Sequence, residues 1–331
     1  MLHLSMSFLV TGGAGYLGSH LVDQLANVYG DEIIVIDDFS SGLKTKIPKN
    51  IRLIEGNILD DTIKVALGKV KNLEGIFHVA AKKSVSESIA NPGKYSLENV
   101  SGTMKILELC RAMDIENLVF TSSAAIYGNP GKDGFVRETD LPTPINPYGK
   151  SKFDAERLVE SFCASNQINF AVLRIFNIAG AQSVNLLDSS KDNVIPILID
   201  SMLRDSVFTI HGSDLDTADG TAVRDYIHVN DVVAAQLMTM RYLVEKSVSL
   251  NTPLNISSGK GTSILELISM LQFVSGFNIQ YVFGDSRDGD PSKVIGQNSL
   301  ARDLLGWSPT SDISKLLEEL YSFYSQRQST K

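Results

Sequence analysis

The chain has 331 residues, of which 43% are hydrophobic and 21% charged, and its formal net charge is −8. This composition is typical of a globular protein, and the length suits one large α/β domain or a domain with a smaller partner. The acidic balance, without a dense run of Lys or Arg, argues against nucleic acid as the main partner. No apolar stretch approaches the ~18 residues of a membrane span and no signal-peptide pattern is present, so we expect a cytoplasmic protein without a membrane partner.

Cysteine and histidine are too few and too scattered to predict a metal centre. The two cysteines, Cys110 and Cys163, lie in apolar helical contexts, which predicts buried free thiols and not a disulfide framework. The five histidines have no paired spacing of the kind that binds zinc. We therefore expect no metal.

The first 40 residues have the pattern of a dinucleotide-binding unit. A buried strand is predicted over residues 6–10, followed by a glycine-rich turn over 11–18 and a helix. A second strand over residues 32–36 ends on two acids, Asp37 and Asp38. Strand, glycine turn, helix, strand and acid in this order predict a dinucleotide site far more strongly than a glycine cluster alone.

Each glycine and acid of this pattern has an expected task. Gly12, Gly15 and Gly18 permit a tight turn, the approach of a pyrophosphate to backbone N–H groups, and close contact between helix and strand. Asp37, ~20 residues beyond the last glycine, is expected to bind ribose hydroxyls and to repel a 2′-phosphate, which favours NAD over NADP. Asp38 either shares this role or is a solvated loop acid.

Strands and helices then alternate, which predicts an α/β fold with a doubly wound parallel sheet of the Rossmann type. Strands are expected at 52–55, 76–79, 118–123 and 170–175, and helices at 61–67, 94–113 and 146–167. Ligands of such sheets bind beyond the carboxyl ends of the strands. Three polar segments should therefore meet at that edge: 80–83, 121–128 and the segment that leads to Tyr148.

Tyr148 and Lys152 lie four residues apart on the predicted helix, so both side chains point to the same side. An ammonium beside a phenol favours the phenolate and lowers the phenol pKa from about 10, which makes the phenol a general base. The same spacing also occurs on ordinary surface helices. The pair therefore becomes a candidate only together with the predicted cofactor site.

The second half of the chain has polar side chains at the ends of further elements. Asn177 follows the strand at 170–175, and Asn193 precedes a helix whose first N–H groups suit a diphosphate. Asp231 is expected to be the N-cap of another helix.

Two arginines, Arg224 and Arg287, suit bidentate pairing with phosphate. The alternative is that both are surface residues, paired with the adjacent Asp225 and Asp288.

These features together resemble the extended short-chain dehydrogenase/reductase family, and most closely its UDP-glucose 4-epimerase branch. The resemblance covers nearly the whole chain, from about Ser7 to Tyr321. It is carried by motifs at residues 11–20 (TGGAGYLGSH), 99–103 (NVSGT), 122–128 (SSAAIYG), 147–152 (PYGKSK), 173–177 (LRIFN) and 219–229 (DGTAVRDYIHV). The last motif is characteristic of the epimerase branch.

The resemblance implies a reaction and its catalytic residues. The expected reaction is a reversible, NAD-dependent epimerisation at C4 of a UDP-hexose through a 4-keto intermediate. Tyr148 is implied as the acid/base, Lys152 as the residue that holds the nicotinamide ribose, and Ser123 as the hydrogen-bonding partner of the sugar 4-oxygen. A homodimer through helices at 94–112 and 148–167 is also implied.

The resemblance also implies two sets of binding residues and two domains. NAD is expected to contact Gly12, Gly15, Tyr16, Leu17, Gly18, Asp37, Asp38, Asn57, Ile58, Ala80, Ala81, Lys83, Asn99, Ser122, Tyr148 and Lys152. The UDP-sugar is expected to contact Ser123, Tyr148, Asn177, Asn193, Arg224, Arg287 and Asp290. Residues 1–176 should form the NAD-binding domain, rejoined by a segment around 223–256, and 177–331 mainly a smaller α/β domain for the UDP-sugar. For Asn99 and Ser122, a purely structural hydrogen bond is the alternative.

Three positions depart from the family pattern. Asn57 replaces the usual Asp near the adenine, and Ile175 replaces a frequent Tyr, which puts one cofactor contact in doubt. Val294 replaces a larger residue expected at the wall of the hexose pocket. The smaller side chain predicts room for an N-acetyl group at C2.

Several other functions fit the sequence less well. A 4,6-dehydratase or decarboxylase requires an extra acid/base beside the catalytic Ser, where this chain has Ala124 and Ala125. A NADP reductase is disfavoured by Asp37, and a non-catalytic NAD-binding sensor by the presence of all three catalytic residues. A UDP-N-acetylhexosamine or UDP-pentose 4-epimerase remains open.

Overall fold

The computed structural model describes residues 6–329 apart from 69, 71, 132, 189, 191 and 288. The chain divides into two compact units. Unit 1 consists of Met1–Ile126, Asn146–Arg174 and Val233–Leu254, and unit 2 of Tyr127–Ile145, Ile175–Val232 and Asn255–Lys331. The segment at 127–145, which the sequence assigned to the first domain, thus lies in unit 2, and the later segment of unit 1 covers 233–254.

The seven-stranded sheet confirms the predicted Rossmann-type α/β fold. Its strand order is β11-β7-β5-β4-β1-β2-β3, and the neighbouring strands from β5 to β3 all run parallel. This order reverses at β1, so the loops after β1, β2 and β4 emerge side by side at the carboxyl edge. The strands are β1 (Ser7–Thr11), β2 (Ile33–Asp37), β3 (Arg52–Glu55), β4 (Leu73–His78), β5 (Asn117–Ser123), β7 (Asn169–Ile175) and β11 (Leu254–Ile256).

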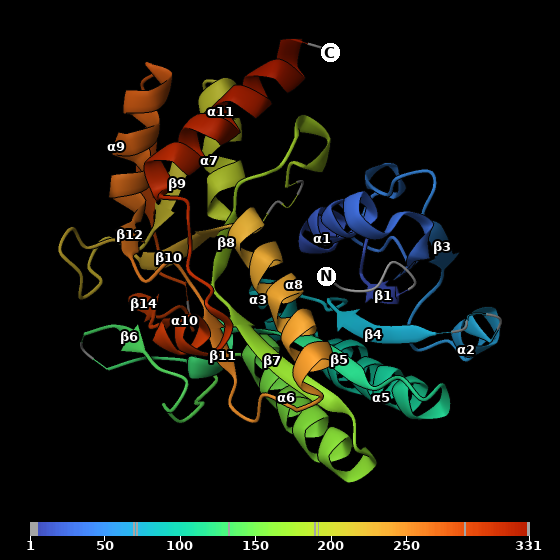
Figure 1. Ribbon diagram of the computed structural model, residues 1–331. Helices are drawn as coiled ribbons and strands as arrows, with labels where there is room; N and C mark the ends of the chain where they lie inside the picture. Colours follow the sequence, from blue (N-terminus) through green and yellow to red (C-terminus); the bar gives the residue numbers. More distant parts are fainter. Residues whose placement is uncertain are drawn as a thin grey trace. The chain divides into compact units, whose positions relative to one another are not determined.

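Helices cover both faces of this sheet (Figure 1). On one face, Ile34 and Ile76 belong to a buried cluster with Ile106 of α5 and Val159 of α6. On the other face, a Cβ on Gly75 would lie 2.7 Å from Met240 Cε of α8. The helices of this unit are α1 (Tyr16–Tyr29), α2 (Thr62–Leu67), α3 (Val85–Ala90), α4 (Pro92–Tyr95), α5 (Gly102–Ala112), α6 (Pro147–Asn166) and most of α8 (Val229–Lys246).

The helix predicted over 94–113 is present, but it is not α-helical throughout. Between α4 and α5, residues Ser96–Ser101 form a π-helical segment. Such segments are uncommon and frequently occur at functional sites. Here the segment contains Asn99, whose side chain is buried.

Unit 2 has its own small sheet and apolar core. Its sheet has the order β12-β10-β14-β6, with β8 paired to β10, and a separate pair joins β9 and β13. Its elements are β6 (Phe135–Val136), β8 (Asn177–Ala179), β9 (Phe208–His211), β10 (Val223–His228), β12 (Gly261–Ser263), β13 (Tyr281–Gly284), β14 (Lys293–Gly296), α7 (Val194–Leu203), α9 (Ile264–Ser275), α10 (Ser299–Leu305) and α11 (Ile313–Ser329). Side chains of α7, α9 and α11 form its apolar core.

Asp231 is not the N-cap that the sequence predicted. The helix α8 begins at Val229, and Asp231 lies in its first turn. Its carboxylate accepts hydrogen bonds from Thr310 N and Oγ1 at 3.0 and 2.7 Å and from Ser311 N at 3.2 Å. The acid therefore fixes a distant loop of unit 2, a partner that no local pattern indicates.

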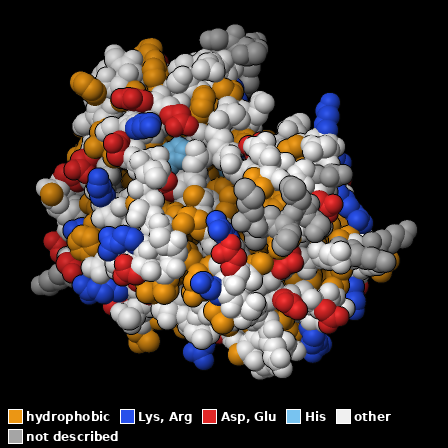
Figure 2. Space-filling model, in the orientation of Figure 1, with side chains coloured by type: hydrophobic (Ala, Val, Ile, Leu, Met, Phe, Trp, Pro, Cys, Tyr) orange, Lys and Arg blue, Asp and Glu red, His pale blue; other side chains and the backbone are white. Residues whose placement is uncertain are grey.

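The surface agrees with the charge balance of the sequence. On the face drawn in Figure 2, basic and acidic side chains are interspersed among the coloured atoms, without a continuous basic area. Among the described residues, no helix is long and apolar enough to cross a membrane. The same residues contain no group of three or more His, Cys, Asp or Glu side chains placed to hold a metal ion.

Candidate active site

The glycine turn between β1 and α1 has the close contacts that its sequence predicts. Gly12 has φ +70°, and a Cβ there would lie 2.7 Å from Ala80 Cα. A Cβ on Gly18 would lie 2.0 Å from the carbonyl oxygen of Gly12. The first turn of α1, which contains Tyr16 and Leu17, follows Gly15 without a side-chain cap. The turn therefore offers N–H groups and a helix dipole to a phosphate, and these residues fit a dinucleotide.

Asp37 is buried at the carboxyl end of β2 and helps to shape this turn. Its Oδ2 accepts from Ala14 N and its Oδ1 from Phe39 N, both at 2.8 Å. Burial raises the pKa of Asp37, whereas these two hydrogen bonds and Lys82 lower it. The carboxylate thus holds the glycine turn and the start of the loop after β2, and its contact with a ribose stays a prediction.

Asp38 belongs to an exposed polar cluster together with Asn57. Asn57 donates from Nδ2 to Asp38 Oδ2 at 3.0 Å and to Glu98 Oε2 at 3.3 Å. Its Oδ1 accepts from Leu59 N at 2.9 Å. The amide oxygen of Asn57, the residue that replaces the usual Asp near the adenine, thus has a backbone partner in its own loop. The neighbouring Ile58 contacts α5, since a Cβ on Gly102 would lie 2.7 Å from Ile58 Cδ1.

Asn99 fixes the loop that follows β4. Its Oδ1 accepts from Lys82 N at 2.8 Å, and its Nδ2 donates to Lys82 O at 3.0 Å and to Ser151 Oγ at 2.9 Å. The hydrogen-bonding role proposed as the alternative thus exists, and it connects this loop to the helix α6. Ala81 is half-buried in the same loop and Lys83 is exposed.

Tyr148 and Ser123 lie together at the carboxyl edge of the sheet. Asn146 caps α6 by accepting from Gly149 N at 2.8 Å, which fixes the first turn where Tyr148 lies. Burial raises the pKa of Tyr148, and a hydrogen bond to the Ser123 side chain lowers it. The ring of Tyr95 meets the Tyr148 ring edge-on at 6.3 Å. The predicted pairing of phenol and hydroxyl is therefore present.

Lys152 lies one turn further along α6 and is 4% exposed. Its Nζ lies 4.4 Å from the centre of the Phe120 ring. Burial lowers the pKa of Lys152 to about 8, against a smaller opposite effect of the Glu156 carboxylate. Burial is the largest effect on the Tyr148 pKa and raises it, so the depression by Lys152 that the helical spacing indicates stays a prediction.

Glu156 of α6 and Arg174 of β7 form a buried ion pair, which the sequence did not predict. Arg174 donates from Nη2 to Glu156 Oε2 at 2.9 Å and from Nε to Oε1 at 3.2 Å. Ser122 donates from Oγ to Glu156 Oε1 at 2.5 Å. Ser122 thus has the structural role offered as its alternative, and it anchors the residue next to Ser123.

A buried histidine joins three elements beneath the glycine turn and was also missed. Thr11 Oγ1 lies 2.7 Å from His78 Nδ1, and His78 Nε2 lies 3.0 Å from Thr103 Oγ1. The same Thr11 oxygen accepts from Ala80 N at 3.2 Å. Burial lowers the pKa of His78 to about 3, so the imidazole is neutral. A lone histidine at a strand end gives no signal of these partners.

In unit 2, Arg224 pairs with Asp290 and not with Asp225. Arg224 Nη2 donates to Asp290 Oδ1, and its Nη1 donates to Val223 O at 2.9 Å. Asp225 is fully buried and accepts from Ser258 N at 2.7 Å. The surface pairing with Asp225 that the sequence left open is therefore wrong for Arg224.

The other expected substrate residues lie at separate points of unit 2. Asn177 is exposed at the start of β8, and Arg287 is exposed in the loop before β14. Asp288, its possible partner, lies outside the described residues. Asn193 precedes α7 and donates from Nδ2 to Asp188 Oδ2 at 2.5 Å. Val294 is buried on β14, in register with Arg224 on β10.

Comparison with known proteins agrees with this geometry. The NAD dependent epimerase/dehydratase family model matches residues 8–252. A UDP-glucose 4-epimerase of Lacticaseibacillus casei is 35% identical over 324 residues, which cover 96% of this chain and 97% of that protein. A crystal structure of a UDP-glucose-4-epimerase from Stenotrophomonas maltophila, with bound NAD and formylated UDP-arabinopyranose, superposes with a TM-score of 0.91 at 30% identity and covers 98% of this chain and 100% of that chain. A UDP-N-acetylglucosamine 4-epimerase from Methanobrevibacter ruminantium M1, in complex with UDP-N-acetylmuramic acid, has a TM-score of 0.82 at 27% identity, and the match covers 97% of this chain and 98% of that chain.

Proposed function

Because the chain belongs to the NAD dependent epimerase/dehydratase family, we propose that it interconverts UDP-glucose and UDP-galactose by epimerisation at C4. The observation that supports this reaction most directly is the hydrogen bond between Tyr148 and Ser123, one helical turn from the buried Lys152. Unit 1 would bind NAD, and unit 2 would bind the UDP-sugar. The active form would be a homodimer through α5 and α6.

In this proposal, Tyr148 moves the proton of the sugar 4-hydroxyl. Bound NAD supplies the acceptor and donor of the C4 hydride, and its positive ring favours the phenolate. Ser123 would accept the proton of the sugar 4-hydroxyl while its own hydroxyl proton moves to Tyr148, which acts as general base. Tyr148 returns the proton as general acid when the 4-keto sugar is reduced on its other face. Lys152, held over Phe120, binds the nicotinamide ribose.

The residues after Ser123 limit the reaction to this reversible oxidation. Ala124 and Ala125 are the first two residues of the short 3-10 turn Ala124–Tyr127 that follows β5. Neither alanine side chain exchanges a proton, so the two positions directly after Ser123 offer no further acid/base for elimination or decarboxylation after the 4-ketone forms. This favours epimerase chemistry over dehydratase chemistry.

Residues of unit 2 would hold the nucleotide of the substrate. Arg224 and Arg287 would bind the diphosphate, and Asp290 a uridine ribose hydroxyl, with Asn177 and Asn193 as further contacts. The ion pair between Arg224 and Asp290 supports a shared site for the two groups. A guanidinium suits this task because its planar fork pairs two oxygens at once.

The test of the reaction uses the purified chain with UDP-glucose or UDP-galactose and measures the approach to equilibrium from both sides. Tyr148→Phe should lower kcat by about 100-fold or more, because general acid/base catalysis contributes that much, while NAD binding persists. Tyr281→Phe, at a tyrosine 42% exposed in unit 2, is the matched control and should act as wild type. Near-normal turnover of Tyr148→Phe would contradict the mechanism.

A second substrate is favoured by the small side chain at Val294. Its burial on β14, in register with Arg224, supports a position close to the bound sugar nucleotide. We expect turnover of UDP-N-acetylglucosamine as well as UDP-glucose, and Val294→Tyr should reduce the first selectively. An unchanged ratio of the two kcat/KM values would reject this role of Val294.

A further inference from the structure

The glycine turn is enclosed by the loops that follow β2 and β4. On the β4 side, Gly12 approaches Ala80 so closely that a Cβ would lie 2.7 Å from the Ala80 Cα. On the β2 side, a Cβ on Gly42 would lie 2.7 Å from the carbonyl carbon of Ala14. In the sheet order, β1 lies between β4 and β2. The two loops therefore flank the turn from opposite sides.

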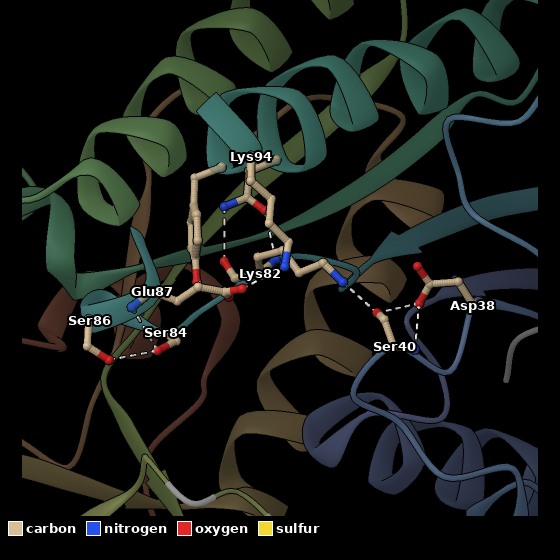
Figure 3. A network of polar contacts seen from close by, with 9 residues as sticks. Asp38, Ser40, Lys82, Ser84, Ser86, Glu87 and Lys94 are labelled. Atoms are coloured by element: carbon tan, nitrogen blue, oxygen red, sulfur yellow. Dashed lines mark hydrogen bonds and ion pairs between the residues drawn. The ribbon is translucent and has the colours of Figure 1, made fainter. Parts of the chain in front are cut away.

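A side-chain bridge connects these two loops. Lys82, after β4, donates from Nζ to Ser40 Oγ at 2.5 Å, and Ser40 Oγ donates to Asp38 Oδ1 at 2.6 Å. Figure 3 shows the Lys82 side chain extended toward Ser40 and Asp38. The bridge joins residues 42 positions apart in the sequence. Together with the contacts at Gly12 and Gly42, it closes a ring around the glycine turn.

The two ends of the bridge are anchored differently. The Lys82 backbone is fixed, because both its N–H and its carbonyl bond the buried Asn99 side chain. At the other end, Ser40 N also donates to Asp38 Oδ1, at 2.9 Å. The bridge itself is exposed. Opening it therefore requires only rotation of the Lys82 side chain, without movement of either loop backbone.

We propose that the Lys82–Ser40 bridge is a latch that retains the dinucleotide on the glycine turn. This inference rests on the dinucleotide site of the proposed function and assigns a role to Lys82, which is not among the residues expected to contact NAD. A dinucleotide whose pyrophosphate lies against the first N–H groups of α1 is enclosed by the ring of the two loops. Its release requires the bridge to open, so the bridge slows dissociation.

The test measures the dissociation rate of the cofactor directly. The enzyme is loaded with NADH, and the loss of bound-NADH fluorescence is followed after addition of excess NAD. Lys82→Met and Ser40→Ala should each accelerate dissociation about two- to fivefold, the factor that one exposed polar pair supports. The double variant should be no faster than either single variant, because both remove the same bridge.

Two controls distinguish the effect of the latch from the effect of losing a positive charge and from local damage to the loop at Ser40. Lys105→Met removes one exposed lysine of the same unit, which pairs with Asp61 at 2.9 Å, and it should leave the rate unchanged. Ser40→Thr keeps the hydroxyl and should restore slow release.

Three results would overturn the latch. Acceleration by Lys82→Met but not by Ser40→Ala would mean that the ammonium acts by charge alone, and unchanged rates in both would exclude any role. A wild-type enzyme that binds no dinucleotide would refute the site and the latch together. An enzyme that binds NADH but does not epimerise UDP-hexoses would refute only the proposed function, since the rates still decide the latch.

Discussion

The buried ion pair between α6 and β7 allows a quantitative prediction for unit 1. Glu156 and Arg174 are 1% and 4% exposed, and the carboxylate accepts two bonds from the guanidinium and one from Ser122. Arg174→Met would leave the Glu156 carboxylate buried without this cation. Because an uncompensated buried charge is costly, the substitution should lower the free energy of unfolding by about 3–5 kcal/mol.

The assay is urea denaturation followed by far-UV circular dichroism. Fluorescence of the single tryptophan, Trp307, is less suitable because this residue belongs to unit 2. Arg157→Met is the matched control, since Arg157 is exposed on α6, the helix that contains Glu156. Its loss should change the free energy of unfolding by less than about 0.5 kcal/mol. Glu156→Leu combined with Arg174→Met should recover most of the loss, because an apolar pair avoids burying a charge. If Arg174→Met is as mild as Arg157→Met, the reasoning fails.

Two further predictions concern buried groups whose pKa values are shifted. Burial lowers the pKa of Lys152 from 10.5 to about 8, so the cost of burying its ammonium, about 3 kcal/mol, is complete below pH 8 and disappears as the pH rises to 10.5. Lys152→Met should remove this rise of stability with pH, and an unchanged pH profile would contradict the assignment. Asp225, with its pKa raised by burial from 3.8 to about 6, accepts hydrogen bonds at both oxygens, from Ser258, Gly259 and Gly296. The protonated Asp225 carboxyl stabilises the folded state, and this stabilisation is complete below pH 3.8 and is lost as the pH rises through 6. Asp225→Asn sets an amide donor against N–H groups and should cost about 2–4 kcal/mol at pH 7; a calorimetric loss below 1 kcal/mol would count against this network.

Local sequence patterns were sufficient to predict the glycine turn, the strand and the helix named below. They also predicted the edge of the sheet at which the candidate site lies. The glycine turn, the strand that ends on Asp37 and the helix that begins at Pro147 are each specified by residues close together in sequence. Parallel strand order then brings their carboxyl ends to one edge, so Ser123 and Tyr148 could be expected to meet. The family resemblance added the roles of these residues, which spacing alone did not give.

Contacts between distant segments could not be predicted, because they leave no periodic signal. Ser122 and Glu156 are 34 residues apart, and Lys82 and Ser40 are 42 apart. The same applies to Arg224, for which the adjacent Asp225 seemed the natural partner in sequence. A neighbour in a strand points to the opposite face, so Asp225 is directed into the interior while Arg224 reaches Asp290.

The helical spacing of Tyr148 and Lys152 fixed their direction but not their charge. From spacing alone, the ammonium should lower the phenol pKa, yet burial of the phenol has the larger effect and raises it. Burial also lowers the Lys152 pKa to about 8, so both groups are shifted toward their neutral forms. A phenol in this environment is deprotonated, and so able to act as a general base, only when a further positive charge and a hydrogen-bond donor favour its anion. Ser123 is such a donor, and the oxidised nicotinamide of NAD would supply such a charge, so in the proposed reaction the ionisation of Tyr148 would be coupled to the cofactor that accepts the hydride.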